Sequence, residues 1–146
     1  MTAPVELPRC LVTTGIGTSE GHARHLAEVA ARFCGQPARF ASTGSLSRGA
    51  PPGAENDWLI VFSQGLSANA RHALTDPGRW AGVFLVTGLS EDTAKEDGLS
   101  DEKKDWLKDL SGCGVTRIDL GCGAEYGALI RVIGARAGYV VAWSLM

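Results

Sequence analysis

The sequence predicts an α/β protein, a three-layer, doubly wound sandwich built around a five-stranded parallel sheet. Short apolar runs alternate along the chain with segments of helical periodicity, the order typical of parallel sheets with helices on both faces. The runs are continuously apolar, as expected of strands covered on both sides. With 146 residues, 45% of them hydrophobic, the chain has the size of one globular domain. We expect this domain to span residues 9–146, after a short leader at residues 1–8.

The first strand and the first helix form one predicted unit. The β-branched run Cys10–Thr14 stops at a glycine, and a helical pattern begins at Ser19. Gly35 and Pro37 are expected to end this helix. Its predicted inward face consists of Ala23, Leu26, Ala27, Ala30 and Phe33.

The rest of the chain repeats the alternation of strands and helices. Asp57–Ser63 is the clearest strand, because its residues form an uninterrupted apolar run. Residues 42–56 are rich in Gly, Pro and Ser and predict a loop. The remaining elements are a strand at Ala38–Ala41, a short helix from Ser67 to about Leu74, a strand at Ala81–Thr87, a polar helix capped by Ser100 with Trp106, Leu107 and Leu110 facing inward, a strand at Val115–Leu120, and a helix from about Glu125 to the end.

Charge and composition exclude several classes of partner. A net charge of −2 provides no basic surface for nucleic acid or an anionic membrane. Ala124–Met146 is nearly long enough to span a bilayer, but Glu125, Arg131 and Arg136 argue against insertion. The first ten residues lack the pattern of a signal peptide. The four cysteines form no CxxC pair, so we expect a cytoplasmic protein with reduced thiols, no metal and no cofactor.

Two strand–turn–helix segments carry the residues best suited to bind a ligand. They are Thr14–Ser19 and Phe62–Ala70, each a buried strand followed by a turn rich in glycine and hydroxyls. In a parallel sheet both turns lie at the carboxyl edge, where open α/β sheets bind their ligands. Glycines let the backbone approach closely, and hydroxyls and helix N-terminal N–H groups suit an anion. The alternative is that Thr18 and Ser67 are ordinary N-caps.

The first glycine turn does not fit the common nucleotide-binding motifs. No Lys precedes a Ser or Thr after the glycines, so it is not a Walker loop. A dinucleotide fingerprint would need a third glycine at position 20, where Glu20 stands, and Gly21 comes one place late. A flavodoxin-like flavin or nucleotide site would also need ring and ribose contacts that the sequence does not offer.

The order of the motifs resembles the sugar isomerase (SIS) family of phosphosugar-binding domains. A Gly17-Thr18-Ser19 turn precedes an Ala-rich helix, and a later apolar strand ends in Ser63-Gln64-Gly65 with Ser67 beyond it. The family typically shows a GTS turn and an SQSGxT turn at this separation. Here one serine of the second motif is missing, Ser67 stands where Thr is usual, and Asn69 replaces a common Asp.

A third segment supports the same resemblance. Residues 122–127, Cys-Gly-Ala-Glu-Tyr-Gly, are similar to a Gly-x-Glu-x-Gly segment in the first SIS half of glucosamine-6-phosphate synthase-type proteins. The resemblance implies that the phosphate and the sugar contact Gly17, Thr18, Ser19, Ser63, Gln64, Gly65, Ser67 and Asn69. It also implies that Glu125, the one catalytic candidate, borders the sugar; alternatively this residue stabilises a helix N-terminus.

The sequence offers few groups for catalysis. Aldose–ketose isomerisation needs a base and an acid, whereas His22, His25 and His72 are expected to face solvent or cap helices. In two-domain synthases of the family the catalytic groups come mostly from the second SIS half. Two functions therefore remain open: a sugar-phosphate isomerase subunit completed by a partner, or a sensing module without turnover.

The predicted last helix suggests where a partner would bind. Gly127, Gly134 and Gly138 fall on one face, and apolar residues surround them, as in a helix that is buried on most sides. We expect this helix to mediate a homodimer or to contact a companion SIS subunit. The alternative is that it only crosses the sheet.

Overall fold

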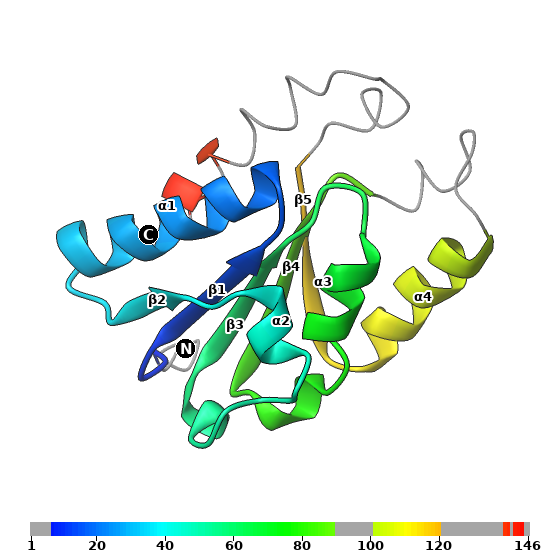
Figure 1. Ribbon diagram of the computed structural model, residues 1–146, viewed down its shortest axis with the longest axis horizontal. Helices are drawn as coiled ribbons and strands as arrows, with labels where there is room; N and C mark the ends of the chain where they lie inside the picture. The colour runs from blue at the N-terminus through cyan, green and yellow to red at the C-terminus, as the bar shows by residue number, and fades with distance from the viewer. Residues whose placement is uncertain (1–6, 90–100, 121–138, 141, 145–146) are drawn as a thin grey trace, which may run out of the picture.

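The protein is built on one parallel sheet of five strands. The computed structural model describes residues 7–89, 101–120, 139–140 and 142–144. The strand order is β2-β1-β3-β4-β5, and all neighbouring strands are parallel, which confirms the predicted fold class (Figure 1). The strands are β1 (Leu11–Gly15), β2 (Ala38–Phe40), β3 (Trp58–Phe62), β4 (Gly82–Thr87) and β5 (Val115–Asp119).

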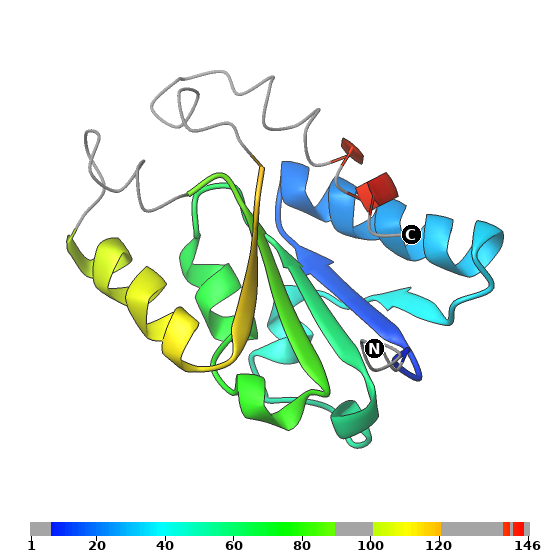
Figure 2. The same ribbon diagram turned by 180° about the vertical axis from the view of Figure 1, so that it is seen from behind.

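Helices cover both faces of the sheet and complete three layers. Helix α1 (Thr18–Phe33) covers one face, and α2 (Thr43–Leu46), α3 (Ala68–Ala73) and α4 (Asp101–Gly112) cover the other (Figures 1 and 2). Two 3₁₀ turns, η1 (Ala54–Asn56) and η2 (Pro77–Arg79), precede β3 and β4. Each face has its own hydrophobic core.

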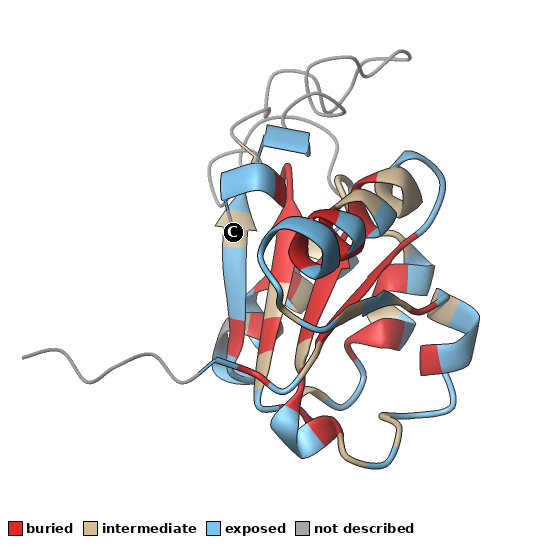
Figure 3. Cartoon of the chain, turned by 90° about the vertical axis from the view of Figure 1, so that its left-hand side faces the viewer, coloured by how far each residue is buried: buried red, intermediate tan, exposed pale blue. Residues whose placement is uncertain are grey.

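The central strands are buried because alternate side chains enter the two cores. In β3, Leu59 and Val61 face the core under α3 and α4, whereas Ile60 and Phe62 face the core under α1. The α1 core also includes Ala23, Leu26 and Ala30. Figure 3 shows this burial in the middle strands and along the inner side of α1. The continuous apolar runs of the sequence are thus explained by two-sided coverage.

Two sequence predictions for local structure are corrected, and a third is confirmed. Residues 42–56 are not a plain loop: the Ser42 side chain accepts a hydrogen bond from the Ser45 N–H and caps α2, and η1 follows. Phe33, the last residue of α1, does not face inward but is 73% exposed. The inward positions predicted for α4 are confirmed, since Leu107 and Leu110 are buried and Trp106 packs on the same core.

The C-terminal residues that the structure describes lie against α1. Residues 139–140 and 142–144 are helical, and Ala142 is buried in the core under α1. Ser100, Glu125 and the glycines at 127, 134 and 138 lie outside the described residues. Among the residues described, the structure contains no helix long and apolar enough to cross a membrane.

Candidate functional site

The two glycine- and hydroxyl-rich turns follow neighbouring strands at the same edge of the sheet. Strands β1 and β3 are paired in parallel, with Thr14 opposite Val61 and Gly15 opposite Phe62. Helices α1 and α3, which follow the two turns, leave toward opposite faces (Figures 1 and 2). The order β2-β1-β3-β4-β5 reverses direction between β1 and β3. This is the topological switch point where doubly wound sheets form their ligand crevice.

The first turn is shaped by glycine. A Cβ on Gly15 would lie 2.4 Å from the carbonyl oxygen of Ser19, so only glycine fits there without a backbone shift. Gly17 has a φ of 62° and is the N-cap of α1, with no side-chain capping bond. Thr18 is therefore the first helical residue and not an N-cap, which corrects one of the two alternatives. Thr18 is exposed and Ser19 half-buried.

Two buried threonines just before this turn behave differently. The Thr13 hydroxyl donates to the Ala23 carbonyl at 2.7 Å and ties β1 to α1. The Thr14 hydroxyl is also fully buried, but it has no hydrogen-bond partner among the described residues. Unsatisfied buried polar groups are uncommon and costly. Thr14 lies in the second-last paired position of β1, beside the switch point.

The second turn is shaped by hydrogen bonds. Ser63 is 5% exposed, and its hydroxyl oxygen accepts from the Ser67 N–H at 3.1 Å. The Ser67 hydroxyl in turn accepts from the Ala70 N–H at 3.3 Å and caps α3, so the N-cap alternative is confirmed for this residue. A serine hydroxyl that accepts a bond still carries one O–H to donate. Leu66, with a φ of 52° and a fully buried side chain, anchors the turn.

The carbonyls of the second turn are bound by two other elements. The Gln64 carbonyl accepts from the Gly88 N–H at 3.0 Å and from the Thr87 hydroxyl at 3.2 Å. The Gly65 carbonyl accepts from the Lys103 ammonium, with Nζ at 2.9 Å. Lys103 is a half-buried residue of α4 that sequence reasoning missed. No local signal could have found it, because it lies 38 residues from Gly65 inside a polar helix.

The predicted substrate-binding residues fall into these two turns. Gly17, Thr18 and Ser19 form the first, and Ser63, Gln64, Gly65, Ser67 and Asn69 lie in or just after the second. Asn69 is exposed in the first turn of α3. Glu125, the catalytic candidate, lies outside the described residues. The structure therefore brings the eight predicted substrate-binding residues to one edge of the sheet and leaves their contact with a ligand as a prediction.

The sequence predicted that the histidines of α1 face solvent or cap helices, but the structure places both against aromatic side chains. His22 is 4% exposed, and its ring centroid lies 4.6 Å from that of Tyr139 and 5.9 Å from that of Phe62. His25 is half-buried between Tyr139 and Trp143. The described C-terminal residues cover this side of α1, a long-range contact that helical periodicity alone could not indicate. His72, in α3, is exposed, as the sequence predicted.

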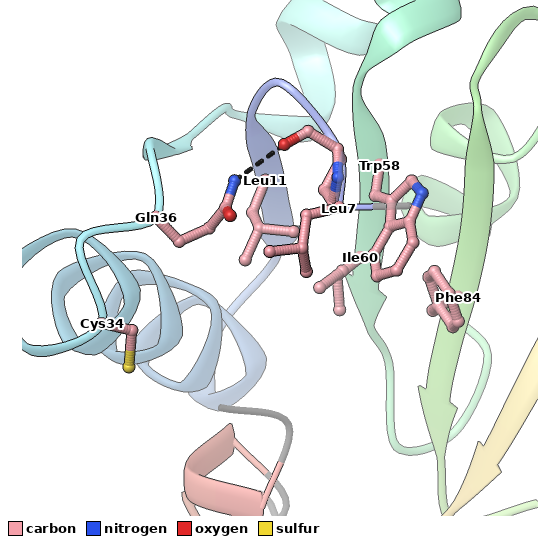
Figure 4. A pocket seen from close by; sticks show the side chains of 8 residues that line it. Leu7, Leu11, Cys34, Gln36, Trp58, Ile60 and Phe84 are labelled. Atoms are coloured by element: carbon pink, nitrogen blue, oxygen red, sulfur yellow. Dashed lines mark hydrogen bonds between the residues drawn. The ribbon is translucent and has the colours of Figure 1, made fainter. Parts of the chain in front are cut away.

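A cavity of about 220 Å³ lies near the amino ends of the strands, away from the two turns (Figure 4). Its lining includes Gln36, which donates to the Pro8 carbonyl at 2.9 Å, and the Cys34 thiol. The larger part of the lining is apolar and consists of Leu7, Leu11, Trp58, Ile60 and Phe84. Such a surface offers little to stabilise a phosphate group.

The amino edge of the sheet is closed by an ion pair. The Arg9 guanidinium binds both carboxylate oxygens of the buried Asp57 at 3.0 Å and also donates to the Gly53 carbonyl. The hydrogen bond to Asp57, and then its charge, raise the pKa of Arg9. Burial raises the pKa of the neighbouring Cys10 thiol, which favours its neutral form.

Among the described residues no group of three or more His, Cys, Asp or Glu side chains could hold a metal ion.

Comparison with known proteins identifies the fold. No protein-family model and no curated protein sequence matches this chain. Solved structures do match. A Bacteroides fragilis NCTC 9343 protein, described as a phosphosugar isomerase involved in capsule formation, is 20% identical with a TM-score of 0.61, over 92% of this chain and 65% of that protein. A Silicibacter pomeroyi DSS-3 protein, also described as a phosphosugar isomerase, is 18% identical with a TM-score of 0.56, over 94% of this chain and 40% of that protein.

One domain of a further enzyme shares the same architecture. The C-terminal domain of glucosamine-fructose-6-phosphate aminotransferase from Francisella tularensis is 9% identical with a TM-score of 0.59, over 94% of this chain and 37% of that one. This chain thus spans less than two thirds of each of these three proteins. These likenesses confirm the fold that the motifs predicted: the chain has the fold of the phosphosugar isomerase (SIS) domains. Its correspondence to the first half of a synthase stays a prediction.

Proposed function

We propose that this chain is a phosphosugar-binding domain whose ligand lies between the first and the second turn. The observation that carries the proposal is the position of both turns beside the switch point between β1 and β3. Open α/β sheets bind ligands at this place. The fold likeness to two proteins described as phosphosugar isomerases supports the same class of ligand.

The chemistry of the turns suits a phosphate ester. Helix α1 has 16 residues and begins at a glycine N-cap without a side-chain capping bond, so its first N–H groups can face an anion. The hydroxyls of Thr18, Ser19, Ser63 and Ser67 can each donate one hydrogen bond. The unsatisfied Thr14 hydroxyl nearby is a further polar group that a ligand or a bound water would satisfy.

We assign turnover, in contrast, to an assembly. Residues 15–19 and 63–69 include no carboxylate and no imidazole, whereas aldose–ketose isomerisation needs an acid and a base. Glu125 is proposed to border the sugar, and a second copy or a companion SIS subunit would supply the remaining groups. The same lack of titratable groups favours one alternative function, a sugar-phosphate sensor without turnover.

Calorimetric titration tests the proposed ligand class. Glucose 6-phosphate, fructose 6-phosphate and glucosamine 6-phosphate are added to the purified chain, with unphosphorylated glucose as the ligand control. We expect at least one phosphate ester to bind, and Ser63→Ala/Ser67→Ala to weaken it by about tenfold or more, because each lost charge-assisted hydrogen bond costs at least that factor. The matched control is Ser45→Ala/Ser47→Ala, two exposed serines of the α2 segment.

Two further measurements keep the result interpretable. Ser67→Thr retains a hydroxyl and an N-capping side chain, so it should bind like the parent even if the double variant folds poorly. Size analysis with a coupled isomerase assay then separates the two functions: turnover in a dimer supports the isomerase subunit, and ligand binding without turnover supports the sensor. Absence of binding to all three esters, or equal binding by the Ser63/Ser67 double variant, would contradict the proposed site.

A further inference from the structure

We infer that Lys103 supplies the positive charge of the proposed anion site, so that α4 takes part in ligand binding together with the two turns. This inference rests on the proposed function and extends it to a residue outside the predicted motifs. It begins from a single contact between distant parts of the chain. The Lys103 ammonium lies 2.9 Å from the carbonyl oxygen of Gly65, in the middle of the second turn.

The position of Lys103 is fixed by the packing of α4. Arg71 of α3 forms an ion pair with Glu102 and lies over the Trp106 ring, with its guanidinium carbon 5.2 Å from the ring centroid. Leu107 and Leu110 are buried in the core under the sheet. These contacts hold α4 against α3 and the sheet. The packing of α4 therefore places Lys103 beside the second turn, within reach of the Gly65 carbonyl.

The second turn is immobilised on both sides of this contact. The Gln64 carbonyl is bound by Thr87 of β4 and by Gly88, and Leu66 is fully buried after it. Gly65 lies between them, and its carbonyl is the atom that Lys103 contacts. A rigid turn with a fixed cation beside it is preorganised for an anion, because no reorganisation is needed when the charge arrives.

The charge balance of the site favours such a cation. The two turns contain no Lys or Arg and the chain has a net charge of −2, whereas a phosphate ester brings up to about two negative charges. An ammonium group has three N–H donors and can bridge a backbone carbonyl and a phosphate oxygen. Hydrogen bonds between such charged groups are about twice as strong as neutral ones. Lys103 would thus add a charged contact to a site built otherwise from neutral donors.

A purely structural role makes a different prediction. If Lys103 only braces the Gly65 carbonyl, a neutral donor of similar reach should replace it. Lys103→Gln keeps an N–H donor but removes the charge, Lys103→Arg keeps the charge, and Lys103→Met removes both. Lys104→Met is the matched control, because Lys104 is the next residue of α4 and pairs with Asp101 at 3.2 Å.

The test measures the affinity for inorganic phosphate and for whichever of the three sugar phosphates binds the parent most tightly, at low and at high salt. We expect Lys103→Gln and Lys103→Met to bind about tenfold more weakly or worse, Lys103→Arg to stay within about threefold of the parent, and Lys104→Met to match it. The affinity of the parent should fall with added salt more steeply than that of Lys103→Gln, since one ionic contact is missing in the variant. Thermal unfolding checks that the variants remain folded.

The outcomes separate this inference from the proposed function. Parent-like affinity and salt dependence in Lys103→Gln, whatever Lys103→Met does, would show that the charge is not used; the inference would then fall while the phosphate site stands. A parent that binds no phosphate ester and no inorganic phosphate would overturn both.

Discussion

The two turns at the carboxyl edge reach similar positions by opposite means. The first is determined by backbone sterics: Gly15 admits no side chain because of the Ser19 carbonyl, and Gly17 has a positive φ. The second contains one glycine but is held by side chains, through the Ser63 and Ser67 hydroxyls and the Lys103 ammonium. The hydroxyls of the first turn therefore contribute no capping bond to its shape, whereas those of the second turn are part of its structure.

Substitutions of polar side chains should therefore have different effects in the two turns: on binding alone in the first, and on both binding and stability in the second. In the first turn a polar side chain can be replaced without loss of a capping bond, so an effect on binding would report on the ligand alone. In the second turn the same kind of substitution changes the fold locally as well. Substitutions in both turns make this distinction measurable, from the largest expected loss of stability to the smallest.

The largest effect is expected for Gly15→Ala. The new Cβ would lie 2.4 Å from the Ser19 carbonyl oxygen and 2.6 Å from its carbon, both backbone atoms that cannot move without shifting the start of α1. Overpacking of this kind costs about 3 kcal/mol of the free energy of unfolding. Urea denaturation of parent and variant measures the loss.

Gly17→Ala is the control in the same turn. Its Cβ would meet no atom of the described residues within 4 Å, so only the positive φ of 62° opposes the substitution, at about 1–2 kcal/mol. A loss for Gly15→Ala no greater than that for Gly17→Ala would mean that α1 can shift to admit a side chain. The first turn would then not be sterically determined.

A smaller effect is expected for the serines of the second turn. Ser63→Ala removes the acceptor of the Ser67 N–H at a buried position, which costs about 1–3 kcal/mol. Ser67→Ala removes the N-cap of α3 and should cost about 1 kcal/mol. Thermal or urea unfolding of both variants measures these losses. Ser42→Ala, which removes the N-cap of α2, is the matched control, and a Ser63→Ala loss smaller than this control would contradict a structural role for Ser63.

The sequence predicted the sheet well because its signal is local and strong. Asp57–Ser63 has the pattern of a buried strand, and β3 spans Trp58–Phe62 within it. Because the strands were predicted to be parallel, both turns were expected at the same edge of the sheet. The resemblance to a phosphosugar-binding family rested on the short motifs in those same turns.

Contacts between distant segments could not be predicted in the same way. Lys103 reaches Gly65 only because α4 packs on α3, and His22 is buried beside Tyr139, which lies far along the chain from α1. No periodic pattern or motif in the sequence indicates either contact. Short helical turns such as α2 were also missed, since a single capped turn of four residues carries little periodic signal.

The smallest effect on stability is expected for Thr18→Ala/Ser19→Ala in the first turn. Neither residue caps α1, whose N-cap is Gly17 without a side-chain bond, and Thr18 is exposed. The free energy of unfolding should therefore change by about 0.5 kcal/mol or less. If the phosphate lies between the turns, the affinity for the sugar phosphate should nevertheless fall about tenfold, because two donors to an anion are lost. Calorimetry and urea unfolding of the same preparation separate the two quantities. A variant that loses stability but not affinity would reverse the division proposed here, and would place the anion at the second turn alone.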